Sequence, residues 1–173
     1  MLVERIENRW LAAFTRTFTL CKVQPGEVVA ILAETQSRRV NVDLARLALE
    51  AMGARVFEVT LTTPALTAPA PVRSTGASDA IGQLGPVVAA LARADMVVDC
   101  TVEGLLHAPE LPTIMKGVDG HMPRLLMVSN EHPEILERTV PDPALEGVVR
   151  SAMKKLRAAQ QMHVTSAAGT DLR

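Results

Sequence analysis

Residues 99–110 contain the histidine that is best placed for acid–base chemistry. They follow the apolar run 96–98 and read Asp-Cys-Thr-Val-Glu-Gly-Leu-Leu-His-Ala-Pro-Glu. His107 stands directly after Leu105 and Leu106, in a segment that a glycine and a proline mark as a loop. Imidazole exchanges a proton near neutral pH, so His107 is the candidate general acid or base, and the two leucines are candidate substrate contacts. A structural role for a single loop histidine stays open at this point.

A second polar stretch, residues 34–39, follows the apolar run 28–33 and reads Glu-Thr-Gln-Ser-Arg-Arg. A segment of helical periodicity comes next, which places this stretch at a helix N-terminus. Free backbone N–H groups and the helix dipole attract carboxylates and other anions there. Thr35 and Arg38 are therefore candidate substrate-binding residues. The alternative is that Thr35 or Ser37 only caps the helix while the arginine is solvated.

A third polar stretch, residues 129–134, reads Ser-Asn-Glu-His-Pro-Glu and again follows an apolar run, 125–128. Glu131 is a candidate substrate-binding residue, although it fits equally well as an acid at a helix start. His132 precedes a proline and fits an exposed position. Ligands of parallel sheets bind outside the carboxyl ends of the strands, which is where all three polar stretches are expected.

The four histidines do not follow a known metal-binding pattern. HExxH, HxH and CxxC are missing from the sequence, and carboxylates do not alternate with histidines at ligand spacing. We therefore expect no metal ligands in this chain. The patterns GxGxxG, GxxxxGK[ST] and GxSxG are missing too, which argues against a dinucleotide, P-loop or α/β-hydrolase site.

Charge and composition argue against two classes of partner. The 173 residues include 18 basic and 19 acidic ones, and only 2% are aromatic. The chain thus lacks the positive field and the aromatic platforms of nucleic-acid-binding proteins. Its apolar runs are shorter than the ~20 residues of a membrane span, and charges stand where a signal peptide is apolar. We expect no nucleic acid, no membrane and a cytoplasmic location, where Cys21 and Cys100 would be reduced, although one disulfide stays open.

Short apolar runs alternate with segments of helical periodicity along most of the chain. This pattern is typical of βαβ units and predicts an α/β fold that is Rossmann-like, with a mostly parallel sheet of about four or five strands and helices on both faces. The expected strands are 28–33, 56–61, 96–98, 125–128 and 162–165, and the expected helices are 3–17, 40–51, 86–92, 109–115 and 143–156.

Residues 62–78 contain three prolines and a glycine among small residues, a composition that favours a long loop. Loops of this length in a compact domain are often functional or take part in subunit contacts. We expect either a lid or a contact in a homo-oligomer, and a surface excursion without function is the alternative.

Three segments carry a resemblance to a known family. They are 99–110 with Leu-Leu-His-Ala-Pro-Glu, 125–136 with Asn-Glu-His-Pro-Glu, and 164–172 with Gly-Thr-Asp-Leu. They resemble the N-terminal domain of 2,5-dihydroxypyridine 5,6-dioxygenases, enzymes of nicotinate degradation related to aminopeptidase T-like metallopeptidases. The opening helix and the Rossmann-like order agree, so the resemblance covers nearly the whole chain. Gly-Thr-Asp-Leu occurs in both branches, whereas Leu-Leu-His-Ala-Pro-Glu favours the dioxygenases.

The resemblance implies a substrate-facing domain of an iron-dependent, ring-cleaving dioxygenase that acts on a dihydroxylated pyridine or a similar small aromatic ring. Leu106 and His107 match the pair that the family brings to its substrate, and His107 would transfer a proton. The resemblance places Fe(II) on a C-terminal domain that this sequence does not contain, so the chain alone would be inactive. Residues 1–165 would form the N-terminal domain, and 166–173, which end within a turn, would begin the connection. The alternatives are the matching domain of a metallopeptidase and a scaffold or oligomerisation module without chemistry.

Overall fold

The computed structural model describes residues 5–65, 77–128 and 130–173. Two compact units divide the chain, Met1–Val140 and Pro141–Arg173. Most of residues 62–78, the expected lid or subunit contact, lie outside the described residues. None of the described helices is long and apolar enough to cross a membrane.

The first unit is built around a parallel sheet of four strands in the order β2-β1-β3-β4. The strands are β1 (Val28–Glu34), β2 (Arg55–Leu61), β3 (Met96–Asp99) and β4 (Arg124–Met127), and each pairing between neighbours is parallel. The predicted fold class is confirmed: the unit is an α/β fold with a wholly parallel sheet. The next strand in the sequence, β2, lies on one side of β1. The chain then crosses to the other side of β1, where it forms β3. The point where the strand order reverses therefore lies between β1 and β3.

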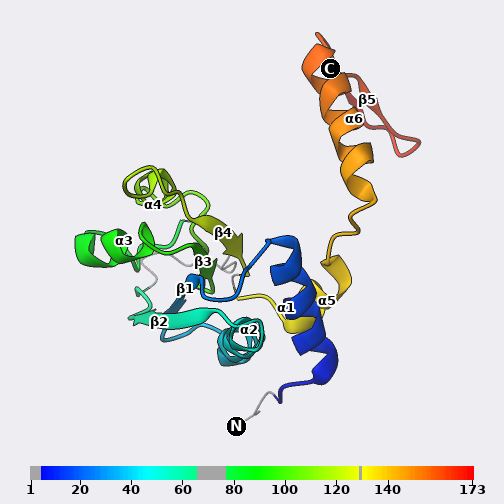
Figure 1. Cartoon of the computed structure of the whole chain (residues 1–173). Coiled ribbons are helices and arrows are strands. Elements are labelled where there is room, and N and C mark those ends of the chain that lie inside the picture. The colour runs from blue at the N-terminus through cyan, green and yellow to red at the C-terminus, as the bar shows by residue number, and fades with distance from the viewer. Residues whose placement is uncertain (1–4, 66–76, 129) are drawn as a thin grey trace. The chain divides into compact units, whose positions relative to one another are not determined.

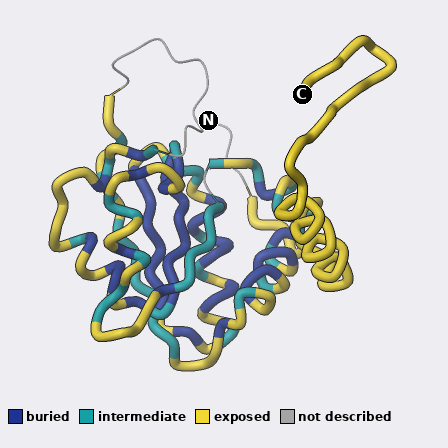
Figure 2. Tube along the Cα trace, turned by 90° about the horizontal axis from the view of Figure 1, so that it is seen from above, coloured by how far each residue is buried: buried dark blue, intermediate teal, exposed yellow. Residues whose placement is uncertain are grey.

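Helices cover both faces of this sheet (Figure 1). On one face lie α1 (Asn8–Leu20), α2 (Arg39–Ala51) and α5 (Pro133–Thr139), and on the other lie α3 (Gly85–Leu91) and α4 (Leu111–Lys116). The central strands are buried on both faces, as Figure 2 shows, because successive residues point to opposite sides. Val29, Ile31 and Ala33 pack in the α1–α2 core, whereas Ala30 and Leu32 pack in the α3–α4 core.

The predicted helices form, with differences at their ends. The first begins at Asn8, later than its apolar spacing suggests. The second ends as predicted: Ala51 is its last residue, and Gly53 adopts a left-handed conformation with φ of 81°. A Cβ at Gly53 would lie 3.2 Å from Cβ of Pro25, so close packing favours glycine here as well.

The second unit consists of α6 (Leu145–Ala158) and a two-stranded antiparallel hairpin of β5 (Val164–Thr165) and β6 (Asp171–Leu172). The last predicted strand therefore forms, but it pairs with β6 and does not join the parallel sheet. The terminal residues thus close a hairpin, which the sequence pattern did not indicate. Every residue of this unit is exposed.

Candidate active site

The loops that follow β1 and β3 are joined by hydrogen bonds at the carboxyl edge of the sheet. The Ser37 hydroxyl donates to the carbonyl oxygen of Cys100 at 2.6 Å and accepts from the backbone N–H of Glu34. The Glu34 carboxylate accepts from the backbone N–H of Val102 at 3.3 Å. These hydrogen bonds therefore link the loops after β1 and β3 at the point where the strand order reverses.

The loop after β4 is tied to the start of α2 in the same way. The backbone N–H of Arg38 donates to the side-chain oxygen of Asn130. The Nε of the Arg38 side chain donates to the backbone carbonyl oxygen of Asn130 at 3.4 Å. The Asn41 amide donates to the carbonyl oxygen of Glu131 at 2.7 Å. Two sequence-predicted residues, Arg38 and Glu131, thus lie on loops that the structure brings together.

The third predicted group lies on the loop after β3. Leu106 is 56% exposed, whereas Leu105 is fully buried in the α3–α4 core. The His107 imidazole is exposed and makes no hydrogen bond to a described residue. The loop therefore exposes the Leu106 and His107 side chains to solvent, while the buried Leu105 side chain attaches the loop to the core.

Asp99 holds this loop from inside the protein. Its side chain is fully buried and accepts from the hydroxyl and backbone N–H of Thr101, at 2.6 and 2.9 Å, and from the backbone N–H of Leu105, at 2.8 Å. The Thr101 hydroxyl accepts in turn from the backbone N–H of Gly104. Burial, together with the nearby charge of Glu34, raises the pKa of Asp99, and the three hydrogen bonds oppose this rise.

Glu34 is a second buried carboxyl group at this edge, with 3% exposure. Its Oε1 accepts from the hydroxyl of Ser78 at 2.7 Å and from Val102, whereas its Oε2 is buried without a described partner. Ser78 also donates its backbone N–H to the carbonyl oxygen of Gly104. Both carboxyl groups therefore support the segment that leads to His107.

Thr35 and Ser37 do not cap α2, which corrects one of the two interpretations of that stretch. The helix has Arg38 at its N-cap position and no side-chain cap. The Thr35 hydroxyl is paired with Thr63 beyond β2, accepting its backbone N–H at 3.1 Å. Ser37 instead spans the gap to Cys100.

His132 has a structural role that the sequence reasoning missed. It is the N-cap of α5, where Nδ1 accepts from the backbone N–H of Glu134 at 3.3 Å. Its ring packs edge to face on Trp10, with centroids 5.2 Å apart. The cap is thus supplied by the histidine and not by Glu131, and the Ser/Thr/Asp/Asn rule for N-caps does not signal it.

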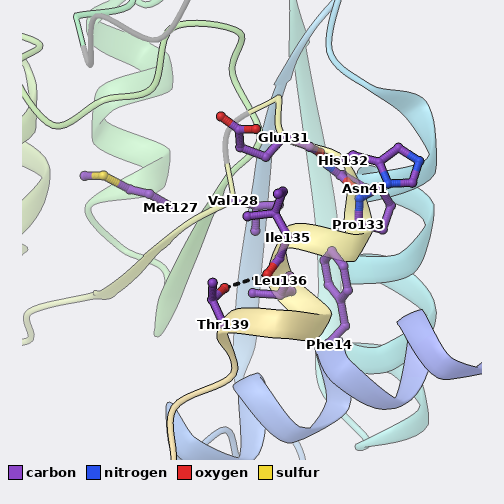
Figure 3. Close-up of a pocket in the computed structure, with 10 residues that line it drawn as sticks. All are labelled: Phe14, Asn41, Met127, Val128, Glu131, His132, Pro133, Ile135, Leu136 and Thr139. Atoms are coloured by element: carbon purple, nitrogen blue, oxygen red, sulfur yellow. Dashed lines mark hydrogen bonds between the residues drawn. The ribbon is translucent and has the colours of Figure 1, made fainter.

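A pocket of about 200 Å³ opens beside Glu131 (Figure 3). It lies among α1, α2, α5 and the end of β4, with Glu131 and Thr139 toward opposite ends in the view of Figure 3. Its lining includes Phe14, Asn41, Met127, Val128, Glu131, His132, Pro133, Ile135, Leu136 and Thr139. Of the six predicted site residues only Glu131 borders it, so this pocket and the exposed Leu106–His107 pair are separate features.

Asp99 and Glu34 are the supporting residues that the sequence reasoning did not single out. The signal for them was present: each is the last residue of a buried strand. Alternation places Glu34 on the same face as Ala30 and Leu32, and Asp99 on the same face as Val97. An acid that continues the buried face of a strand must find hydrogen-bond partners.

The described residues do not provide a metal centre. Within 5–65, 77–128 and 130–173, no three His, Cys, Asp or Glu side chains are grouped so that they could hold a metal ion. The described part of the chain therefore does not fit the iron that the family resemblance implies.

Comparisons with known proteins agree with the fold and with the sequence motifs. A curated relative, the 2,5-dihydroxypyridine 5,6-dioxygenase of Pseudomonas putida KT2440, is 31% identical over 163 residues, which are 91% of this chain and 44% of the relative. The solved structure of 2,5-dihydroxypyridine dioxygenase from the same strain superimposes with a TM-score of 0.81 at 30% identity, over 96% of this chain and 47% of that one. The chain thus spans less than half the length of these relatives.

A family model described as 2,5-dihydroxypyridine 5,6-dioxygenase (NicX) matches residues 9–173, which include the parallel sheet, the His107 loop and the terminal hairpin. On this match the chain belongs to the 2,5-dihydroxypyridine 5,6-dioxygenase family.

Proposed function

We propose that this chain is the substrate-facing part of an Fe(II)-dependent dioxygenase that opens the ring of a dihydroxylated pyridine or a similar hydroxylated aromatic. The observation that carries the proposal is the exposed Leu106–His107 pair, held at the carboxyl edge of the sheet in a member of this family. Ligands of parallel α/β sheets bind at that edge, next to the point where the strand order reverses.

His107 is the proton-transfer group in this proposal. An exposed imidazole that has no hydrogen-bond partner among the described residues is open to a substrate hydroxyl, from which one ring nitrogen accepts a proton while the ring oxygen gains electron density. The same nitrogen returns the proton at a later step. Leu106 gives the aromatic ring an apolar contact, and Leu105 holds both residues in place from the core.

The neighbouring loops supply the remaining polar contacts of the proposal. The Arg38 guanidinium and the exposed Glu131 carboxylate come from loops tied by Asn130 and Asn41. The Thr35 hydroxyl accepts the backbone N–H of Thr63 and donates to the Thr63 hydroxyl oxygen at 3.3 Å, which leaves one lone pair of the exposed Thr35 oxygen to accept from a ligand hydroxyl. These groups suit a planar molecule with hydroxyl and ring-nitrogen atoms.

Iron enters the proposal only through residues beyond the described ones. Non-haem iron oxygenases use a few histidine and carboxylate ligands with open positions to activate oxygen. The described residues hold no such group, so we propose that the ligands lie outside them and that this chain alone does not turn over a substrate.

The test compares two histidine variants in the protein that contains this chain together with its metal ligands. His107→Ala is expected to lower the turnover of 2,5-dihydroxypyridine by roughly 10²–10⁴-fold at unchanged iron content, the usual contribution of a positioned acid or base. His121→Ala is the matched control. His121 lies near the amino edge, with Nε2 3.3 Å from Asp95, and its removal should leave turnover per folded protein near the wild-type value.

Ring opening is followed by loss of substrate absorbance and by oxygen uptake. Equal turnover in the wild type and in His107→Ala would reject the assigned role of the histidine. Ring opening by this chain alone with added Fe(II) would reject the proposal that the iron ligands lie outside the described residues. Hydrolysis of a dipeptide with no loss of the pyridine would favour the metallopeptidase branch.

A further inference from the structure

The loop that carries His107 is closed back onto the strand it leaves. Asp99 is the last residue of β3, and its Oδ2 accepts from the backbone N–H of Leu105, six residues later, at 2.8 Å. Its Oδ1 accepts both donors of Thr101. Gly104, with φ of 83°, provides the reversal that brings Leu105 back to the carboxylate.

This closure fixes the chain directly before the exposed pair. Leu105 is held twice, by its backbone N–H on Asp99 and by its fully buried side chain in the α3–α4 core. Ala108, on the other side of His107, is buried in the same core and donates its backbone N–H to the Leu105 carbonyl at 3.0 Å. Only the pair between these two anchors faces solvent.

We propose that Asp99 is a positioning residue for His107, acting through the backbone of Leu105 and without touching the substrate. The proposal rests on the function proposed above for His107. A carboxylate suits the task because both of its oxygens accept, so it satisfies Thr101 and Leu105 at once. Asparagine has nearly the same shape but offers only one acceptor, and its NH₂ group would face one of these donors.

A matched residue at the other end of the same strand separates positioning from general support. Asp95 immediately precedes β3, and its Oδ2 accepts from the backbone N–H of Val28 at 2.7 Å. It is thus also an aspartate that accepts from backbone, but it lies at the amino edge. Asp95→Asn therefore removes an acceptor of the same kind without touching the His107 loop.

The experiment is a double-mutant cycle in the iron-loaded protein that contains this chain. Asp99→Asn is expected to lower kcat about 10- to 100-fold, the range produced by a displacement of about 1 Å in a reacting group, with a much smaller change in KM. In the His107→Ala background the same substitution should change kcat less than about twofold, because the group it positions is gone. Asp95→Asn should leave kcat per folded protein near the wild-type value.

Two results would overturn the proposal. One is a kcat loss from Asp99→Asn that is the same with and without His107, which would mean that Asp99 acts through general structure. The other is wild-type kcat in Asp99→Asn. If that variant does not fold, Thr101→Val takes its place in the cycle, because it removes the hydroxyl that bridges Asp99 and Gly104 and leaves the carboxylate in place.

A measurement without turnover keeps this proposal distinct from the proposed function. Amide hydrogen exchange at Leu105 should accelerate in Asp99→Asn and remain unchanged in Asp95→Asn. If the wild type opens no ring, the proposed function fails, and accelerated exchange at Leu105 still supports control of the loop by Asp99. Unchanged exchange at Leu105 in Asp99→Asn would overturn the positioning role whatever the activity.

Discussion

An aspartate at each end of β3 accepts hydrogen bonds from the backbone, but the two aspartates differ in burial. Asp99 at the carboxyl edge is fully buried and accepts three hydrogen bonds within its own loop. Asp95 before the strand has a side chain that is 32% exposed, and it faces the ring of His121 at 3.3 Å. One aspartate organises a loop away from water, and the other joins surface elements in partial contact with water.

The surroundings of the two ends continue this difference. At the amino edge the half-buried Arg124 guanidinium pairs with Glu27 and donates to the carbonyl oxygens of Cys21 and Lys22 at 2.7 and 2.8 Å, where α1 has just ended. Such contacts stabilise the fold but are screened by salt. Buried hydrogen bonds are screened far less, so the carboxyl edge keeps its geometry over a wider range of conditions.

Of the two edges, the carboxyl edge should lose more stability when one hydrogen-bonding group is removed, and Thr101→Val tests this. Valine keeps the shape of the side chain but leaves the buried Gly104 N–H and one oxygen of Asp99 without the hydroxyl. We expect the free energy of unfolding to fall by about 2–3 kcal/mol, measured by urea denaturation. Thr19→Val is the control, since its hydroxyl is exposed and donates to the Thr15 carbonyl within the same helix, and a loss as large as that of Thr101→Val would contradict the comparison.

Arg124→Met should cost less, about 1–2 kcal/mol, because its partners remain accessible to water. Part of this difference from wild type should disappear in 1 M NaCl, which screens the pair with Glu27. The Thr101→Val difference should not change with salt. A salt response of the same size in both variants would remove the distinction between the two edges.

The pH dependence of stability tests the burial of Asp99 directly. Its pKa is raised in the folded protein, so the folded state holds this proton more tightly than the unfolded state does. The resulting stabilisation is present below the ordinary aspartate pKa of about 3.9 and is lost as pH rises toward the folded pKa. In urea titrations the stability advantage of wild type over Asp99→Asn should therefore shrink as pH rises above the ordinary aspartate pKa of about 3.9, and an advantage that grows with pH from there would contradict this.

The smallest effect concerns the two cysteines, one near each edge. Burial raises the pKa of the Cys100 thiol, and Cys100 is completely inaccessible. Cys21 is only partly buried, and there too burial raises the pKa of the thiol, while Arg124 opposes the rise. Iodoacetamide at pH 7.5 should label Cys21 slowly and Cys100 only after denaturant is added, as read by peptide mass spectrometry. Labelling of Cys100 first would show that the carboxyl edge opens more easily than the amino edge.

The fold could be predicted from the sequence because its strands are short apolar runs between helical segments, and burial on both faces requires such runs. The last strand was misplaced because a two-residue pairing between Val164–Thr165 and Asp171–Leu172 leaves almost no periodic signal. Alternation within β1 and β3 does identify Glu34 and Asp99 as inward-facing acids. It cannot identify their partners, because Ser78 and Leu105 reach them only through the folding of loops.

The His107 loop shows the same limit. Its glycine and proline predict a loop, but only tertiary packing decides that Leu105 turns into the core while Leu106 stays 56% exposed. Two neighbouring leucines look identical in sequence. The roles of Thr35, Arg38, Glu131 and His107 toward a ligand, and the expected homo-oligomer, stay predictions.

The strand order also has a consequence for synthesis of the chain. β1 is central, yet its partner on one side comes much later, because Asp95 lies 67 positions after Val28 in the sequence. At about 5–20 residues per second, the ribosome needs roughly 3–13 s to make that interval. During this time one edge of an almost wholly apolar strand has no native partner, so we expect the nascent chain to depend on chaperones until β3 has emerged.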